Sequence, residues 1–169
     1  MPTDADYRAV LDFENLIPDA IAQVFIANGF TADNARTVQS DPEAQKVRPR
    51  IDIWFKVNGA YLPVQEAQLF QELSLNSAYK GTLTLYVISA ADAPGKLVHS
   101  TFRAKVRALS ARMPYLVNGI YLTKHKMHPP MVDGDTAVSL KTQDDLQQTT
   151  LNYGVNFSIQ NDAWAAILP

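Results

Sequence analysis

A strict alternation of apolar and polar side chains near the C-terminus constrains the fold of this chain more than any other feature. The apolar members are Leu151, Tyr153, Val155, Phe157 and Ile159, and the polar or small residues 152, 154, 156 and 158 lie between them. This period of two is typical of a strand that buries one face. We predict that all five apolar side chains are buried and that the strand inserts beside earlier strands, for example residues 51–57. The sheet then needs the whole chain, so truncation before Thr149 should prevent folding.

Two earlier stretches also have the period of a strand. Residues 51–57 of "RIDIWFKVNG" alternate and run into Asn58-Gly59, which favours a hairpin turn, and "GTLTLYVISA" predicts a strand over 81–90. Residues 61–80 fit either a short helix or a return strand. Residues around Asn118-Gly119 are predicted to form a strand or hairpin. Residues 131–148 are predicted to form a polar loop with weak strand character.

Two segments have helical periodicity. Residues 17–28 carry an apolar stripe, with Pro18 suited to the first helical position and Gly29 to the exit. A second stripe follows helical spacing before Pro114, at Val98, Phe102, Val106, Leu109 and Met113. We therefore expect one α+β domain over residues 1–169, with an antiparallel or mixed β-sheet flanked by two main helices.

Composition and motifs exclude several classes of function. The chain has 169 residues and no cysteine, which excludes disulfides, thiolate metal sites and cysteine nucleophiles. It contains neither a Gly-rich phosphate-binding motif nor a G-x-S-x-G nucleophile elbow. No apolar run reaches the length of a membrane span, and residues 1–6 lack the basic start of a secretory signal. These features predict residence in a cytoplasm.

Three clusters of acidic or histidine residues are candidate sites. His125 and His128 are three residues apart, but the prolines and lysines beside them favour a solvated basic turn over a metal site. The "DGD" of residues 133–135 lacks the spacing of a calcium loop and predicts a turn. Asp144 and Asp145 are consecutive, which suits a polar loop better than paired acid–base chemistry. We therefore expect no catalytic residues, no metal site and no cofactor.

The charges are unevenly distributed along the chain. From residue 93 to residue 132 there is no Asp or Glu, so this window carries +7 and the remaining residues −9, for a net charge of −2. Such a split fits a nucleic-acid surface or copies of one protein meeting acidic side to basic side. Trp54 lies on the polar phase of its strand, where it either covers an inter-subunit surface or lies under a helix. The predicted assembly or lumen surface comprises Lys96, Arg103, Lys105, Arg107, Arg112, Lys124, Lys126 and Trp54.

The ordered set of these features resembles the tail completion proteins of tailed bacteriophages, also called tail terminators or head-tail joining proteins. The resemblance is carried by the helix at 17–28, "RPRIDIWFKVNG", "GTLTLYVISA", the basic helix "HSTFRAKVRALSARM" and "LNYGVNFSIQNDAW".

This resemblance implies a structural virion protein without enzymatic activity. It implies a homo-oligomeric ring, often a hexamer, at the head-tail junction of the virion, assembled in the host cytoplasm. Its implied partners are the tail-tube protein and the head connector proteins, with DNA passing through the lumen without sequence-specific binding and no membrane involved. The alternatives are a nucleic-acid-binding accessory protein that uses the basic window 96–126, and a metal-assisted enzyme that uses His125 and His128.

Overall fold

The computed structural model describes residues 1–37, 47–60, 78–141 and 145–167. The N-terminal part contains α1 (Asp4–Leu11), α2 (Phe13–Ala27), β1 (Ala35–Thr37) and β2 (Arg50–Ala60). The remainder contains β3 (Ala78–Ala90), α3 (Ala93–Ser110), α4 (Met113–Val117), β4 (His125–Lys141), β5 (Leu146–Ile159) and α5 (Asn161–Ile167). The ambiguous segment at 61–77 lies outside the described residues, while Ala78, Tyr79 and Lys80 begin β3.

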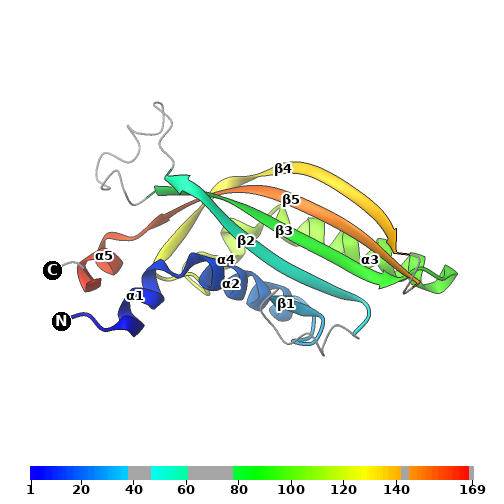
Figure 1. Cartoon of the computed structure of the whole chain (residues 1–169), viewed down its shortest axis with the longest axis horizontal. Helices are drawn as coiled ribbons and strands as arrows, with labels where there is room; N and C mark the ends of the chain where they lie inside the picture. Colours follow the sequence, from blue (N-terminus) through cyan, green and yellow to red (C-terminus); the bar gives the residue numbers. More distant parts are fainter. Residues whose placement is uncertain (38–46, 61–77, 142–144, 168–169) are drawn as a thin grey trace.

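The described strands form one mixed sheet in the order β1-β2-β3-β5-β4 (Figure 1). β1 pairs parallel to β2, and every other neighbouring pair is antiparallel. The α+β prediction is confirmed. The last strand, β5, lies between β3 and β4, so the expectation that it lies beside residues 51–57 of β2 was wrong. β3 occupies that place, since it pairs with β2 on one side and with β5 on the other.

The apolar residues that alternate along β5 lie on the buried face of the sheet. Its five apolar side chains are 0–5% exposed, as predicted: Leu151, Tyr153, Val155, Phe157 and Ile159. Phe157 contacts the rings of Phe13 and Phe55, at centroid distances of 5.0 and 5.7 Å. Because this central strand closes the core, the sheet is incomplete until the end of the chain is in place.

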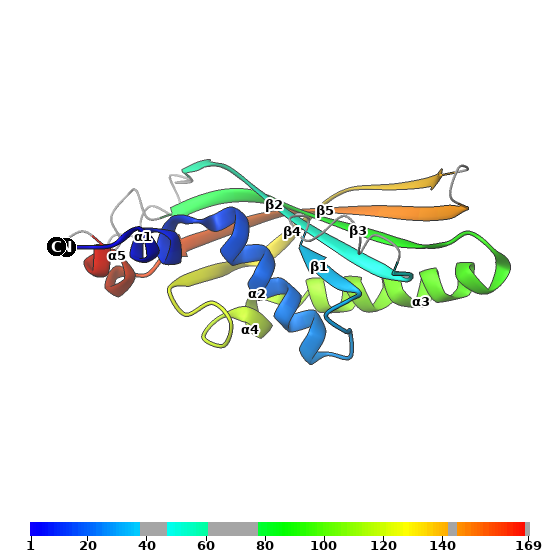
Figure 2. The same cartoon turned by 60° about the horizontal axis from the view of Figure 1, so that its bottom comes forward.

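The main helices cover one face of the sheet. α2 packs beneath β1 and β2, and α3 runs beneath β3 and β5, whereas α1 and α5 lie together at one end (Figure 2). α2 begins at Phe13, four residues before the predicted start, so Pro18 lies inside the helix and is buried. The apolar stripe Ile17, Ile21 and Phe25 is fully buried, and this burial outweighs the hydrogen bond that a proline inside a helix forgoes.

The described residues between 131 and 148 lie mostly in strands, in contrast to the predicted polar loop with weak strand character. β4 extends to Lys141 and β5 begins at Leu146, so most of this segment forms a long antiparallel pair of strands. Two register shifts, between His128 and Val132 and between Asp133 and Thr136, break the alternation in β4. β4 is also at the edge of the described strands, with Thr136, Ala137 and Val138 all exposed. An irregular, exposed edge strand has no strict period to find in the sequence.

Two Asn-Gly pairs also have different structures from those predicted. Asn58-Gly59 lies inside β2 at a register shift opposite β3, where Gly59 has a φ of 136°. Asn118-Gly119 follows α4 and precedes β4, so it forms a turn without a first hairpin strand. The Asn118 side chain holds this turn against β4, because it accepts from the Met127 N–H and donates to the Met127 carbonyl.

Candidate assembly surfaces

The helix α3 is attached to the sheet through both polar and apolar groups. Asp92 caps its first turn, accepting a hydrogen bond from the Gly95 N–H at 2.6 Å. The residues of α3 that are buried against the sheet are Gly95, His99, Val106 and Ser110. The predicted stripe was therefore wrong at Val98, which is 43% exposed. The spacing of Val98 and Phe102 did not reveal that a histidine and a serine occupy the buried side.

His99 connects α3 to two strands. Its Nδ1 lies 2.6 Å from the Ser89 hydroxyl of β3, and its Nε2 lies 2.8 Å from the Thr149 hydroxyl of β5. All three side chains are at most 3% exposed. Burial lowers the pKa of His99, and the neighbouring Arg103 lowers it further, so the imidazole is held neutral. This Ser-His-Thr cluster has no carboxylate and is closed to solvent, which fits a structural anchor rather than a catalytic centre.

The cations of α3 flank its exposed side. The outermost positions carry small or apolar residues: Leu97, which is 73% exposed, and the exposed Ala104 and Ala108. Arg103 and Arg107 lie along one flank, four residues apart, and Lys105 points to the other because it is two residues from each. Arg103 also reaches the Thr149 hydroxyl at 3.5 Å.

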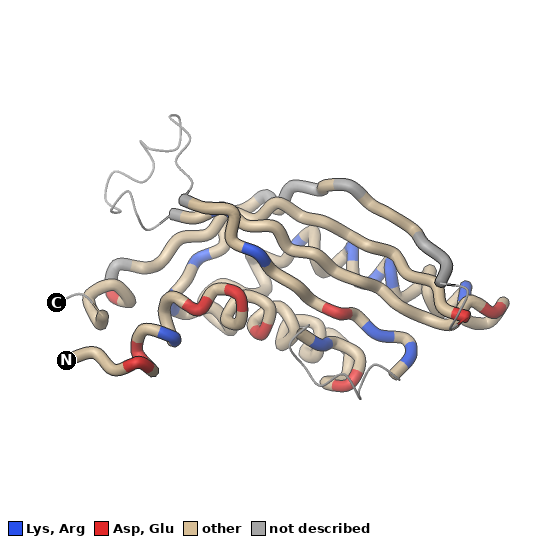
Figure 3. The backbone as a smooth tube through the Cα atoms, viewed as in Figure 1, with Lys and Arg blue, Asp and Glu red and all other residues tan. Residues whose placement is uncertain are grey.

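The seven cations of the window do not form one surface. The Lys and Arg residues of α3 lie along the helix (Figure 3), with Arg112 just after its end. Lys96 lies in the first turns of α3, close in sequence to Asp92. Lys124 is near the other end of the fold, where it helps Thr3 to lower the pKa of Asp6, and Lys126 follows in β4. The structure thus groups the α3 cations and separates Lys124 and Lys126 from them.

A groove of about 600 Å³ lies between the C-terminal half of α3 and the β4–β5 strands. We call it the α3–β4 groove; it is lined by Arg107, Ser110, Ala111, Met131, Gly134, Thr136 and residues 151–153. Among these described lining residues, Arg107 alone is charged. Ser110 is fully buried, and its hydroxyl has no hydrogen-bond partner within the described part of the chain. The groove therefore offers one exposed cation and one unsatisfied hydroxyl.

A second hollow of about 450 Å³ lies at the opposite edge of the sheet, between α2 and β1. This α2–β1 hollow is lined by Asp19, Ala22, Gln23, Ile26, Ala32, Asp33, Ala35, Arg36 and Thr37. Partial burial raises the pKa of Asp19, and the nearby Asp12 raises it further. The acidic residues of α1 and α2 are drawn in Figure 3 along the side of the molecule away from α3.

Trp54 lies on the face of the sheet opposite the helices. No described helix covers this face, and the Trp54 side chain is 48% exposed (Figures 1 and 2). It is aligned with Thr84 and Asn152 across β2, β3 and β5, and the Thr84 hydroxyl donates to Asn152 at 2.9 Å. Trp54 is thus remote from the α3 cations, and the two parts of the predicted assembly surface lie on different faces.

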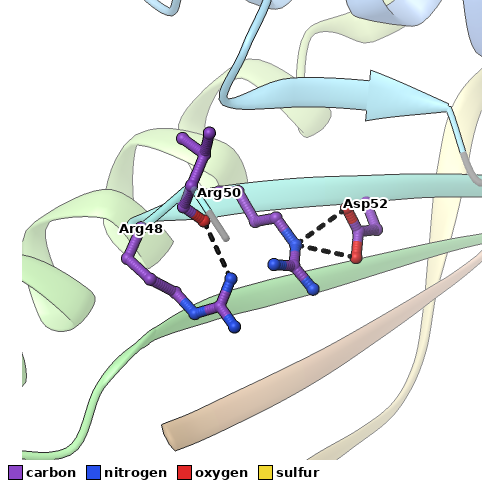
Figure 4. A network of polar contacts seen from close by, with 4 residues as sticks. Arg48, Arg50 and Asp52 are labelled. Atoms are coloured by element: carbon purple, nitrogen blue, oxygen red, sulfur yellow. Dashed lines mark hydrogen bonds and ion pairs between the residues drawn. The ribbon is translucent and has the colours of Figure 1, made fainter. Parts of the chain in front are cut away.

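Arg50 and Asp52 form an ion pair at the start of β2, with 3.1 Å between Nε and Oδ2 (Figure 4). Nearby, Arg48 donates to the Val47 carbonyl at 3.0 Å. Arg50 is 6% exposed, so this pair is largely removed from solvent. We interpret this ion pair as structural, because neither Arg50 nor Asp52 lines either hollow.

The two candidate metal ligands lie in β4, not in the predicted solvated turn, and they do not meet. His125 and His128 are three residues apart in this strand, so their side chains point to opposite faces. Nε2 of His125 lies 2.6 Å from the Val10 carbonyl, and Nε2 of His128 lies 2.8 Å from the Ser158 hydroxyl. Burial lowers the pKa of His125, so the neutral ring donates to Val10. Within the described ranges, no group of three or more His, Asp or Glu residues is arranged to hold a metal ion.

The sequence did not indicate the α3–β4 groove or the α2–β1 hollow. Ser110 and Asp19 were not among the candidate residues that the sequence indicated. None of the helices in the described part of the chain is long and apolar enough to cross a membrane.

Comparison with protein-family models and with curated proteins found no match to this chain.

Proposed function

We propose that this protein forms a head-to-tail ring and acts as a tail terminator at the head-tail junction of a tailed bacteriophage. The observation that supports this proposal is the pair of unlike hollows at opposite edges of one sheet. Arg107 is the charged group of the α3–β4 groove, whereas two acids, Asp19 and Asp33, and one cation, Arg36, border the α2–β1 hollow. Two different surfaces on one subunit suit heterologous contacts, which generate a closed ring when the rotation between copies closes.

In this proposal the protein acts by stoichiometric binding and not by catalysis. The ring caps the tail tube, stops the addition of tube subunits and presents its other face to the head connector proteins. DNA passes through the lumen without being read. Exposed ion pairs contribute only about 0–1 kcal/mol each, so charge steers the subunits together and apolar burial holds them. The exposed Leu97 offers apolar area on α3 itself, and Tyr115 in α4 and Ile120 after α4 are further exposed apolar side chains.

The α3 surface supports the nucleic-acid alternative less well. A phosphate-binding helix would place its cations at the centre of its exposed side, where they can follow the DNA backbone. In α3 the exposed Leu97, Ala104 and Ala108 occupy that place, and the cations flank them. The separation of Lys124 and Lys126 from α3 further reduces any continuous basic surface.

Two measurements test this proposal. Native mass spectrometry and negative-stain microscopy of the purified chain, at rising concentration, should show closed rings of one subunit number. Adding the chain to growing tail tubes should fix their length. A chain that stays monomeric at all concentrations, leaves tube length unchanged and binds duplex DNA with a steep salt dependence would favour the accessory nucleic-acid-binding protein.

A further inference from the structure

We infer that the α3–β4 groove of one copy receives the acidic face of α2 from the next copy, with Asp19 of that copy paired to Arg107. This inference rests on the proposed ring and names the seam within it. The occupant is thus a second copy of this chain. Tube protein, connector protein and DNA are the competing occupants.

The groove has the features of an incomplete contact. Arg107 is exposed on its rim, while Ser110 at its floor is 0% exposed and its hydroxyl has no partner among the described residues. A buried hydroxyl without a hydrogen bond destabilises a folded chain, and such groups are rare in native proteins. A guanidinium and a hydroxyl are both donors, so together they select an acceptor-only group such as a carboxylate.

The α2–β1 hollow offers the complementary group. Asp19 and Gln23 are exposed and one helical turn apart, and the hollow is also bordered by Asp33 and Arg36, so acids outnumber cations there by two to one. The surroundings of Asp19 disfavour the charged form of its side chain, because partial burial and the nearby Asp12 both raise its pKa. A guanidinium brought beside it would favour the charged form and lower that pKa again.

The topology prevents the two surfaces of one copy from meeting each other. Among the described strands, β1 and β4 are the outer ones, with β2, β3 and β5 between them. The groove therefore cannot be filled by the hollow of its own copy, and a second copy that fills it leaves its own groove free for a third. The small residues Ala104 and Ala108 on the exposed side of α3, with Ala111 at its C-cap, allow a partner helix to approach closely.

The inference is tested by mixing two charge-reversed variants. Arg107→Glu and Asp19→Lys each place like charges at every seam, so each alone should need a concentration at least about 10-fold higher for half-assembly. In an equimolar mixture, the reversed groove of one variant meets the reversed edge of the other, and unchanged grooves meet unchanged edges. Rings should therefore form again with the two variants alternating, which native mass spectrometry resolves. Lys105→Glu makes the same change on the other flank of α3 and should assemble like the wild type.

Ser110→Ala tests the floor of the groove separately. The isolated subunit should be at least as stable as the wild type, since an unsatisfied hydroxyl is removed, while ring assembly should weaken by about 3- to 10-fold. Each variant's circular dichroism spectrum and unfolding midpoint establish that its subunit is folded.

The outcomes separate this inference from the proposed function. If the wild type forms rings, three results would each overturn the seam and leave the ring standing. These are unimpaired assembly of Arg107→Glu, failed rescue in the mixture, and unchanged assembly of Ser110→Ala. A wild-type chain that never assembles would overturn the ring itself. Equal loss of DNA binding in Arg107→Glu and Lys105→Glu, with assembly unchanged in both, would assign the α3 flanks to nucleic acid.

Discussion

The helices α2 and α3 lie on the same face of one sheet but are held there by different forces. α2 buries an apolar stripe that includes Ile17, Ile21 and Phe25, all 0% exposed. α3 buries His99 and Ser110 and is tied to β3 and β5 through hydroxyl groups. The α2 contact gains stability from burial, which is non-directional, whereas the α3 contact depends on particular hydrogen bonds. The α2 half therefore builds the core, and the α3 half fixes the position of a surface.

The difference extends to the outer sides of the two helices. The exposed positions of α2 and its neighbours carry acids, including Glu14, Asp19 and Asp33, while α3 carries the cations. Each helix also borders its own hollow at its own edge of the sheet. The two halves of the subunit therefore carry different surfaces, acidic around α2 and basic along α3. A head-to-tail ring requires such a difference, because each contact joins two unlike surfaces.

The largest effect is expected in the apolar half. Phe157→Ala should reduce the free energy of unfolding by about 3–5 kcal/mol, because the ring is 0% exposed among Phe13, Phe55 and Tyr79 and its removal leaves a cavity. Chemical denaturation of the isolated subunit measures the loss. Asn156→Ala, on the opposite face of the same strand, is the control and should cost far less. Equal costs for the two variants would contradict the assignment of the core face.

A smaller effect is expected from replacing the anchor of α3. His99→Leu should cost about 1–3 kcal/mol, since it leaves the Ser89 and Thr149 hydroxyls buried without their imidazole partner. The triple variant that adds Ser89→Ala and Thr149→Val makes this contact apolar and should regain most of the loss. The same denaturation series measures both. If the triple variant were less stable than His99→Leu alone, the account of a polar anchor would be wrong.

The two buried histidines, His99 and His125, should make the stability of the chain depend on pH. His99 and His125 have pKa values lowered below the ordinary 6.5 by burial, so the folded chain favours the neutral rings. Their contribution to stability is complete above that value and is lost as the pH falls through and below it. Thermal unfolding midpoints should therefore decrease between about pH 7.5 and about pH 5, and His99→Leu should flatten the decrease. An unchanged slope in that variant would count against burial of a neutral His99.

The smallest effect on the isolated subunit is expected at the groove floor. Ser110→Ala should shift the unfolding midpoint upward or leave it unchanged, because its hydroxyl has no partner in the described structure. Differential scanning calorimetry is sensitive enough to register this shift. A clear decrease would mean that the hydroxyl forms a stabilising bond in solution, and the groove would then lack its unsatisfied donor.

The sequence predicted those parts of the fold in which one physical effect dominates. In β5 burial on a single face produces a strict period of two, and in α2 it produces a helical stripe. The prediction was wrong where effects compete. In β4, bulges and edge exposure remove the period. In α3, His99 and Ser110 share the buried side with Val106, so two polar residues that look like surface residues are buried.

The candidate surfaces were predictable only in part. The charge split along the chain correctly placed Arg103, Lys105 and Arg107 together on one helix. It could not separate Lys124 and Lys126 from them, because that separation depends on the turn after α4. The two hollows are formed by residues far apart in the sequence, such as Arg107 with Leu151 and Asp19 with Arg36. Contacts of this kind follow from tertiary packing and leave no local pattern.

The central claim is that the α3–β4 groove of one copy meets α2 of the next, and site-directed disulfide trapping tests it most directly. The chain has no cysteine, so Ala111→Cys and Gln23→Cys introduce the only thiols. Oxidation of an equimolar mixture should trap a disulfide between one copy of each variant, because Ala111 borders the groove and Gln23 borders the hollow. A double variant should give covalent ladders up to the ring size. Thr123→Cys, at an exposed position outside both hollows, should not be trapped by Gln23→Cys. Trapping of Gln23→Cys by Thr123→Cys as readily as by Ala111→Cys, or no trapping in assembled rings, would contradict the claim.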